Sequence, residues 1–146
     1  MLRPVALIVF ESGGETYDCS GALVSSASQP ALPYFMTANH CISTAQAARG
    51  ITVYWLYDQP TASGQPDSGK VTAGGATLLA TNEANDFTLM KMINAPPAGV
   101  RFSGWSSAPP TDGTAVTGIH HPQGDYKRIS FGQTIAATCA PDAPPA

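Results

Sequence analysis

Charged residues are scarce in this chain. Lysine and arginine supply 7 of the 146 residues and aspartate and glutamate supply 10, which gives a formal net charge of −3 at pH 7. The basic residues form no cluster, whereas proteins that bind nucleic acid need a basic patch to contact the phosphates. We therefore expect no nucleic-acid partner.

Long apolar runs are also missing. A helix that crosses a bilayer needs about 18 or more consecutive apolar residues, and the apolar run at residues 4–10 has only seven. This run has one basic residue before it and no A-x-A-like cleavage site after it, so we interpret it as a first strand rather than a signal peptide. The sequence predicts no membrane partner.

Cysteine is sparse, with three residues, Cys19, Cys41 and Cys139. Three thiols allow at most one internal bridge and leave one thiol over. Low charge, frequent Gly, Ser and Thr and one possible bridge are typical of exported proteins, because the cytosol keeps thiols reduced. We expect a secreted or periplasmic protein.

Glycine and proline, by contrast, are plentiful, with 14 and 13 residues. They separate short runs of β-branched and aromatic residues, which predicts an all-β protein built as a sandwich or barrel. One Ala-rich stretch, 42–49, predicts a helical turn. The expected strands cover residues 5–10, 20–25, 34–37, 51–57, 76–80, 87–92, 115–119 and 127–131, with a possible further strand at 133–137.

The composition changes between residues 94 and 111, which are rich in Pro, Ala, Gly and Ser. We expect residues 1–93 to form an N-terminal β-barrel, residues 94–111 to be a linker, and residues 112–146 to begin a second β-barrel. Two or three strands cannot bury both of their faces, and an open edge invites further pairing. The second barrel is therefore expected to be incomplete in this chain.

Two ionisable side chains lie in strings that suggest acid–base chemistry. His40 belongs to Thr-Ala-Asn-His-Cys at 37–41, and Asp86 directly precedes the strand-like run 87–92. A histidine can act as a general base near neutral pH when a carboxylate accepts a hydrogen bond from its other ring nitrogen. A carboxylate beside core residues costs free energy unless it is paired. The alternatives are a surface or core histidine and an Asn-Asp turn that starts a strand.

A nucleophile for such a pair is not evident. The string Gly-x-Ser-Gly does not occur, and no serine after Asp86 lies in a Gly-rich elbow that could also supply oxyanion-hole amides. The adjacent His120 and His121 do not predict a metal site, because neighbours in a strand point to opposite faces and no cysteine or carboxylate cluster is near. We expect a structural role for them.

Taken together, these strings resemble the chymotrypsin-like (trypsin-fold) serine peptidases, and among them the lysyl endopeptidase-like branch. The resemblance covers nearly the whole chain and implies a double β-barrel of six strands each, with the active site in the cleft between them. The strings that support it lie at 19–24, 34–41, 51–55, 85–89, 104–105, 119–122 and 127–130.

The resemblance also implies individual roles. It assigns His40 as general base and acid, Asp86 as the carboxylate that orients it, and Cys19 and Cys41 as a disulfide. Such a bridge would close a loop of about 23 residues and stabilise the fold by about 3 kcal/mol on loop entropy. The alternative for the two cysteines is a pair of buried reduced thiols.

We therefore predict a serine endopeptidase, or its N-terminal portion, that hydrolyses polypeptides through an acyl-enzyme without cofactor or metal. The chain alone is expected to be inactive because the nucleophile is absent, and to need a missing C-terminal segment or another chain to complete its second barrel. One alternative is a non-catalytic trypsin-like binding module. Another is a structural β-domain without enzymatic ancestry, which a His40–Asp86 separation above about 5 Å would favour.

Overall fold

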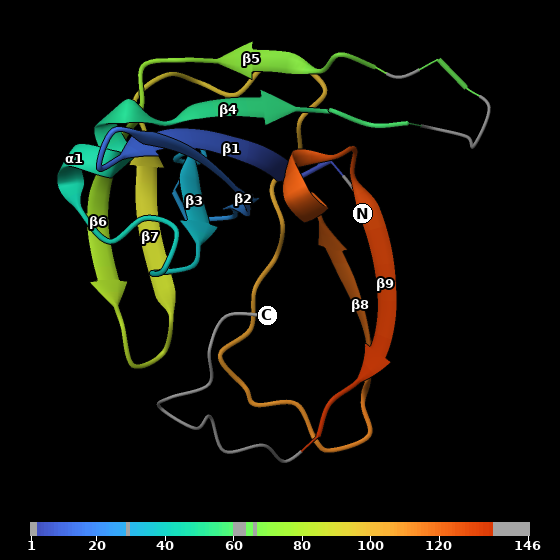
Figure 1. Cartoon of the computed structure of the whole chain (residues 1–146). Coiled ribbons are helices and arrows are strands. Elements are labelled where there is room, and N and C mark those ends of the chain that lie inside the picture. The colour runs from blue at the N-terminus through green and yellow to red at the C-terminus, as the bar shows by residue number, and fades with distance from the viewer. Residues whose placement is uncertain (1–2, 29, 60–63, 66, 136–146) are drawn as a thin grey trace.

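The computed structural model describes residues 3–28, 30–59, 64–65 and 67–135. Within these residues the regular secondary structure is almost entirely β-strand, with one short α-helix (Figure 1). The elements are β1 (Val5–Ser12), β2 (Glu15–Val24), β3 (Tyr34–Thr37), α1 (Ala45–Gly50), β4 (Thr52–Trp55), β5 (Lys70–Thr72), β6 (Ala76–Asn82), β7 (Phe87–Met92), β8 (Ala115–His120), the 3-10 turn η1 (Pro122–Gly124) and β9 (Arg128–Gln133).

The first seven strands form one antiparallel sheet in the order β5-β4-β1-β2-β3-β7-β6. Its two edge strands, β5 and β6, follow each other in the chain and are joined by only three residues, 73–75. So short a connection spans at most about 14 Å. The sheet must therefore curl until its two edges approach each other, and Figure 1 shows β4 and β5 turning across the end of the upright β6 and β7.

Glycines are needed at two places in the first sheet, the β1–β2 turn and the connection between β5 and β6. Gly13 and Gly14 have φ angles of 62° and 86° and form the two-residue connection between β1 and β2, where Ser12 pairs with Glu15. Positive φ at both central residues is the type I′ geometry that matches the twist of a hairpin. Gly75, with φ of 73°, lies so close to the Arg49 backbone that a Cβ would collide with it.

The concave side of the curled sheet is an apolar core. Burial alternates along β4 and β7, so that Trp55 and Met90 face inward. Trp55 packs edge-on against Phe35 at 5.7 Å between ring centroids, and its Nε1 donates to the buried Thr72 hydroxyl at 3.0 Å. The core comprises Ala6, Ile8, Phe10, Leu23, Phe35, Ile42, Ala48, Ile51, Val53, Trp55, Ala76, Met90 and Met92.

Strands β8 and β9 form a separate antiparallel hairpin (Figure 1). Most of its side chains are exposed, and those of Ile129 and Phe131 are 49% and 82% exposed. Before the hairpin, the chain runs along the first sheet, where the Ser103 amide donates to the Leu23 carbonyl at 2.9 Å. The possible strand at 133–137 extends in part outside the described residues, since residues 136 and 137 are not among them.

The expectation of an all-β chain is thus confirmed. In the described part of the chain, no helix is both long and apolar enough to span a membrane. The division into a barrel at 1–93, a linker at 94–111 and a second barrel from 112 remains a prediction.

Candidate active site

His40 lies in the turn between β3 and α1. The Ile42 amide donates to the Ala38 carbonyl at 3.2 Å and closes this turn, which we call the His40 turn, residues 38–42. The next residue, Cys41, forms a disulfide with Cys19 of β2, and their Cα atoms are 6.3 Å apart. The turn that presents the imidazole is therefore covalently tied to the sheet.

Asp86 lies in the turn between β6 and β7. Its φ of 46° is in the left-handed region, which aspartate tolerates better than most residues. In this conformation both carboxylate oxygens reach His40, 46 positions away in the sequence. Oδ1 accepts from the His40 amide at 2.9 Å, and Oδ2 is 2.7 Å from the ring Nδ1.

This two-point contact favours the ionised form of Asp86 and selects the tautomer of the neutral His40 ring. The hydrogen bond from the His40 amide, helped by the one from the ring, holds the pKa of Asp86 below its ordinary value although partial desolvation opposes it. The carboxylate is thus ionised at neutral pH and can only accept hydrogen bonds, so Nδ1 carries a proton. Nε2 of neutral His40 then has a free lone pair and can take a proton from another group.

The pair is open to solvent. The side chains of His40 and Asp86 are 71% and 51% exposed. An exposed ion pair contributes only about 0–1 kcal/mol to stability. The charge attraction alone is therefore too weak to set the geometry of the pair. No serine hydroxyl in the described residues is hydrogen-bonded to the His40 ring.

A metal centre is not formed by these residues. Among the described residues, the group of possible ligands that lies close together is Cys19, His40 and Cys41. Both sulfur atoms are joined in the disulfide and are not available as thiolates. The site offers one imidazole and one carboxylate, which suits proton transfer.

His121 has a structural setting, as expected for the His-His string. It is 3% exposed, its amide donates to the Ser20 hydroxyl at 2.8 Å, and its Nδ1 lies 2.9 Å from the Asp125 carbonyl. Its ring stacks on Tyr57 at 6.0 Å. Burial lowers the pKa of His121, so the neutral ring is favoured. These contacts attach the β8–β9 hairpin to the first sheet.

An ion pair beside His121 was not predicted from the sequence. Lys127 Nζ lies 2.8 Å from Asp58 Oδ1, and the Lys127 side chain is 2% exposed. The Lys127 amide also donates to the Tyr57 carbonyl at 3.2 Å. A nearly buried lysine needs a carboxylate partner, so this pair fixes the start of β9 against the chain that follows β4.

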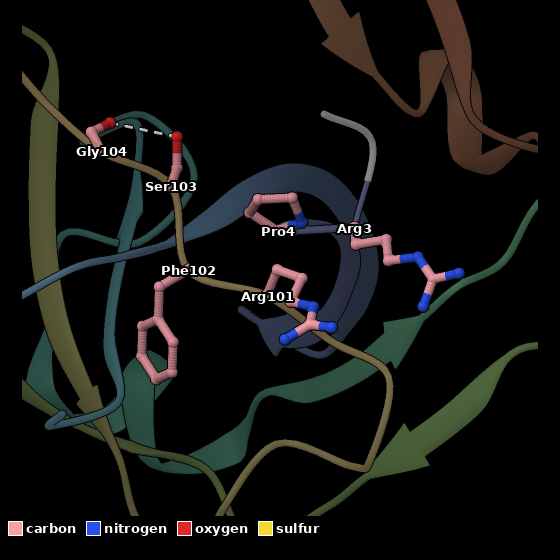
Figure 2. A pocket seen from close by; sticks show the side chains of 6 residues that line it. All are labelled: Arg3, Pro4, Arg101, Phe102, Ser103 and Gly104. Carbon is pink, nitrogen blue, oxygen red and sulfur yellow. Dashed lines mark hydrogen bonds between the residues drawn. The ribbon is translucent and has the colours of Figure 1, made fainter. Parts of the chain in front are cut away.

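A hollow of about 310 Å³ lies apart from these groups (Figure 2). None of its lining residues takes part in the His40–Asp86 contact. Its two charged residues are arginines, whose guanidinium groups stay protonated and cannot act as bases. The lining residues are Arg3, Pro4, Arg101, Phe102, Ser103 and Gly104.

Comparison with known proteins identifies the family. The profile of the family described as "Lysyl endopeptidase, C-terminal domain" matches residues 2–144. The chain belongs to this family. The lysyl endopeptidase of Pseudomonas aeruginosa is 35% identical over 138 residues, which cover 90% of this chain and 30% of that protein. The chain thus spans about 30% of the length of that relative.

Solved structures agree on the fold. The active form of the Rv3671c protease from M. tuberculosis has a TM-score of 0.59 at 17% identity, over 90% of this chain and 48% of that one. The thermostable serine protease AL20 from an extremophilic microorganism has a TM-score of 0.58 at 15% identity, over 90% of this chain and 66% of that one. At these identities the likeness shows the fold alone.

The fold class predicted from the sequence is confirmed by these comparisons. The lysyl endopeptidase-family chain has a trypsin-like, mostly β fold, and its strands fit a partial barrel structure of this kind. It is a protease-related domain. The sequence alone gave no signal for three polar side chains, those of Asn39, Thr81 and Thr88, that connect the two turns of the candidate site.

Proposed function

We propose that this chain carries the acid–base half of a serine endopeptidase active site. The observation that carries the proposal is the two-point contact of Asp86 with the amide and the ring of His40. His40 Nε2 would take the proton from a serine hydroxyl as it attacks the peptide carbonyl, and return it to the leaving amine as the acyl-enzyme forms. Asp86 would hold the ring and stabilise the imidazolium.

The proposal includes a nucleophile from outside these 146 residues. The absence of a Gly-x-Ser-Gly string and the exposure of His40 support a serine supplied by a further segment or by another chain, together with oxyanion-hole donors. The β8–β9 hairpin leaves apolar side chains exposed. This exposure supports the proposal that the same further segment completes a second barrel. The chain alone would then be inactive, and polypeptides would be the substrates.

The proposed setting is the secreted or periplasmic space. The Cys19–Cys41 disulfide supports it, because such bridges persist in oxidising compartments. Membership of the lysyl endopeptidase family supports it as well.

The test is made in the complete protein that contains these residues. His40→Ala should lower kcat for a peptide ester by a factor of about 10⁴ or more, with little change in KM. His120→Asn, which removes a histidine outside the candidate site, is the matched control and should keep its activity. Activity of the His40→Ala protein within tenfold of the unsubstituted protein would reject the assignment.

The isolated 146-residue chain tests whether the nucleophile lies outside these residues. It should not react with a fluorophosphonate probe, since the probe needs an activated serine. Stoichiometric labelling of one serine would show that the chain contains its own nucleophile.

A non-catalytic trypsin-like binding module is the alternative, and it requires that no Gly-x-Ser-Gly string completes the site from outside these residues. In that case the complete protein would bind peptides without turnover, and His40→Ala would leave this binding unchanged.

A further inference from the structure

A line of side-chain hydrogen bonds connects the two sides of the His40 turn through the β6–β7 hairpin. Asn39 Nδ2 lies 2.7 Å from Thr81 Oγ1 of β6. Thr81 Oγ1 lies 2.7 Å from Thr88 Oγ1 of β7, and Thr88 Oγ1 lies 2.6 Å from the Ile42 carbonyl oxygen. We call Asn39, Thr81 and Thr88 the hydroxyl chain. It begins just before His40 and ends two residues after it.

The direction of each bond follows from the number of available hydrogens. A carbonyl can only accept, so Thr88 donates its single hydroxyl hydrogen to Ile42. Thr81 must then donate to Thr88, and Thr81 in turn accepts from the Asn39 amide group. The Thr81 hydroxyl also lies 3.3 Å from the Phe87 carbonyl oxygen, but its contact with Thr88 is shorter, at 2.7 Å. The bonds of the hydroxyl chain thus run in one direction, from Asn39 to the Ile42 carbonyl.

A β-bulge makes the contact possible. Thr81 pairs with Thr88 and Leu78 with Met90, and the register between β6 and β7 shifts between Leu78 and Ala80. Residues three apart in a regular strand point to opposite faces, but the extra residue in the bulge places Leu78 and Thr81 on the same face. That face is the one on which Thr88 is fully buried.

The hydroxyl chain therefore joins the two turns that hold the candidate pair. Asp86 lies in the turn between β6 and β7, which are the strands that supply Thr81 and Thr88. The His40–Asp86 contact is exposed and weak as an ion pair. The buried end of the hydroxyl chain is sheltered from water, and leaving the Ile42 carbonyl unpaired there would cost the full desolvation of that group.

We propose that the hydroxyl chain is a positioning device for the acid–base pair, with Thr88 as its central positioning residue. It holds the His40 amide and ring at hydrogen-bonding distance from Asp86. The role of the hydroxyl chain in catalysis rests on the proposed function. Its effect on the His40–Asp86 contact can be tested without measuring catalysis.

The experiment uses three variants of the 146-residue chain. Thr88→Val keeps the side-chain shape and removes the hydroxyl, whereas Thr88→Ser keeps the hydroxyl. Thr72→Val is the matched control, because it removes another buried threonine hydroxyl, the one that accepts from Trp55. NMR measures hydrogen exchange of the His40 amide and the titration of the Asp86 carboxyl carbon.

Thr88→Val should speed exchange of the His40 amide by about tenfold, the effect of one lost hydrogen bond in a local opening. It should also raise the Asp86 titration midpoint, because the amide bond that lowers the pKa is weakened. Thr88→Ser and Thr72→Val should leave both signals unchanged. Equal signals in Thr88→Val and the unsubstituted chain, or equal shifts in Thr72→Val, would overturn the proposal.

Thr81→Val provides a second variant if Thr88→Val does not fold. Thr81 lies in the exposed part of β6, and its loss breaks the same line of bonds. It should change the two NMR signals in the same direction, and unchanged signals would reject the proposal. Loss of catalysis is not used as a readout. A failure of the proposed peptidase function would therefore appear in the His40→Ala test alone.

Discussion

Replacing Asp86 by asparagine separates the shape of the candidate pair from its charge. The amide oxygen of Asn can still accept from the His40 amide, which lies 2.9 Å from Asp86 Oδ1. Its NH2 group can only donate, so it meets His40 Nδ1 as a donor. The ring must then move its proton from Nδ1 to Nε2. We expect Asp86→Asn to keep the geometry and to reverse the tautomer.

The structure predicts very different magnitudes for stability and for catalysis. Because the two side chains are 71% and 51% exposed, loss of their charge interaction should lower the free energy of unfolding by about 1 kcal/mol or less. With Nε2 protonated, however, the ring cannot accept a proton from a serine. In the complete protein kcat should fall by about 10⁴, which corresponds to about 5 kcal/mol in the activation barrier.

Long-range proton–nitrogen NMR of the imidazole in the 146-residue chain measures the tautomer directly. Neutral His40 should carry its proton on Nδ1 in the unsubstituted chain and on Nε2 in Asp86→Asn. A proton that stays on Nδ1 in the variant would refute the reasoning. So would a loss of more than about 3 kcal/mol in unfolding free energy, because that magnitude belongs to a buried pair.

Two further predictions concern stability. Changing both Cys19 and Cys41 to serine should lower the free energy of unfolding by about 3 kcal/mol, the loop-entropy value for their 22-residue separation. Urea unfolding measures it, and a loss below about 1 kcal/mol would contradict the entropy argument. Because burial lowers the folded-state pKa of His121, its stabilising contribution should be complete above its unfolded-state pKa of about 6.5 and decrease as the pH falls below it. When the pH is lowered from about 7 to about 5, the free energy of unfolding should fall less in His121→Asn than in the unsubstituted chain. An equal fall in both proteins would contradict a lowered pKa of His121.

Most strands could be predicted from their composition, and the exceptions have physical reasons. β5 was missed, because three residues, Lys70–Thr72, show no periodicity. Its strand conformation comes from pairing with β4, where Thr72 meets the Trp55 indole. β4 ends before the predicted residue 57, because Leu56 has φ of 56° and cannot continue a strand. The first half of β2 was missed because it is polar and exposed.

The ends of the helix and of the last strand also differ from those predicted from the sequence. The helical turn expected at 42–49 begins later, at Ala45, because the Thr44 hydroxyl accepts from the Ala47 amide and caps it there. The strand expected at 127–131 continues as β9 to Gln133, and residues 134 and 135 of the possible strand at 133–137 do not lie in a strand. Such boundaries depend on single hydrogen bonds that composition does not reveal.

The candidate site could also be predicted only in part. The strings around His40 and Asp86 suggested that the two side chains could meet, because each is typical of a known chemical role. The hydroxyl chain could not be predicted, because Thr81 reaches the Thr88 face only through the bulge near Leu79. A shift of one residue in register would turn Thr81 away.

The exposure of the pair suggests an order in which its properties arise. In water the attraction between an imidazolium and a carboxylate is weak, and it grows about fourfold when the effective dielectric constant falls from bulk water to that of a protein surface. In the open chain the geometry of His40 and Asp86 must therefore come from the disulfide, the amide contact and the hydroxyl chain. A segment that brought the serine would also cover the pair and exclude water. Orientation would then be built into this chain beforehand, and the electrostatic stabilisation of the imidazolium would follow when the site is completed.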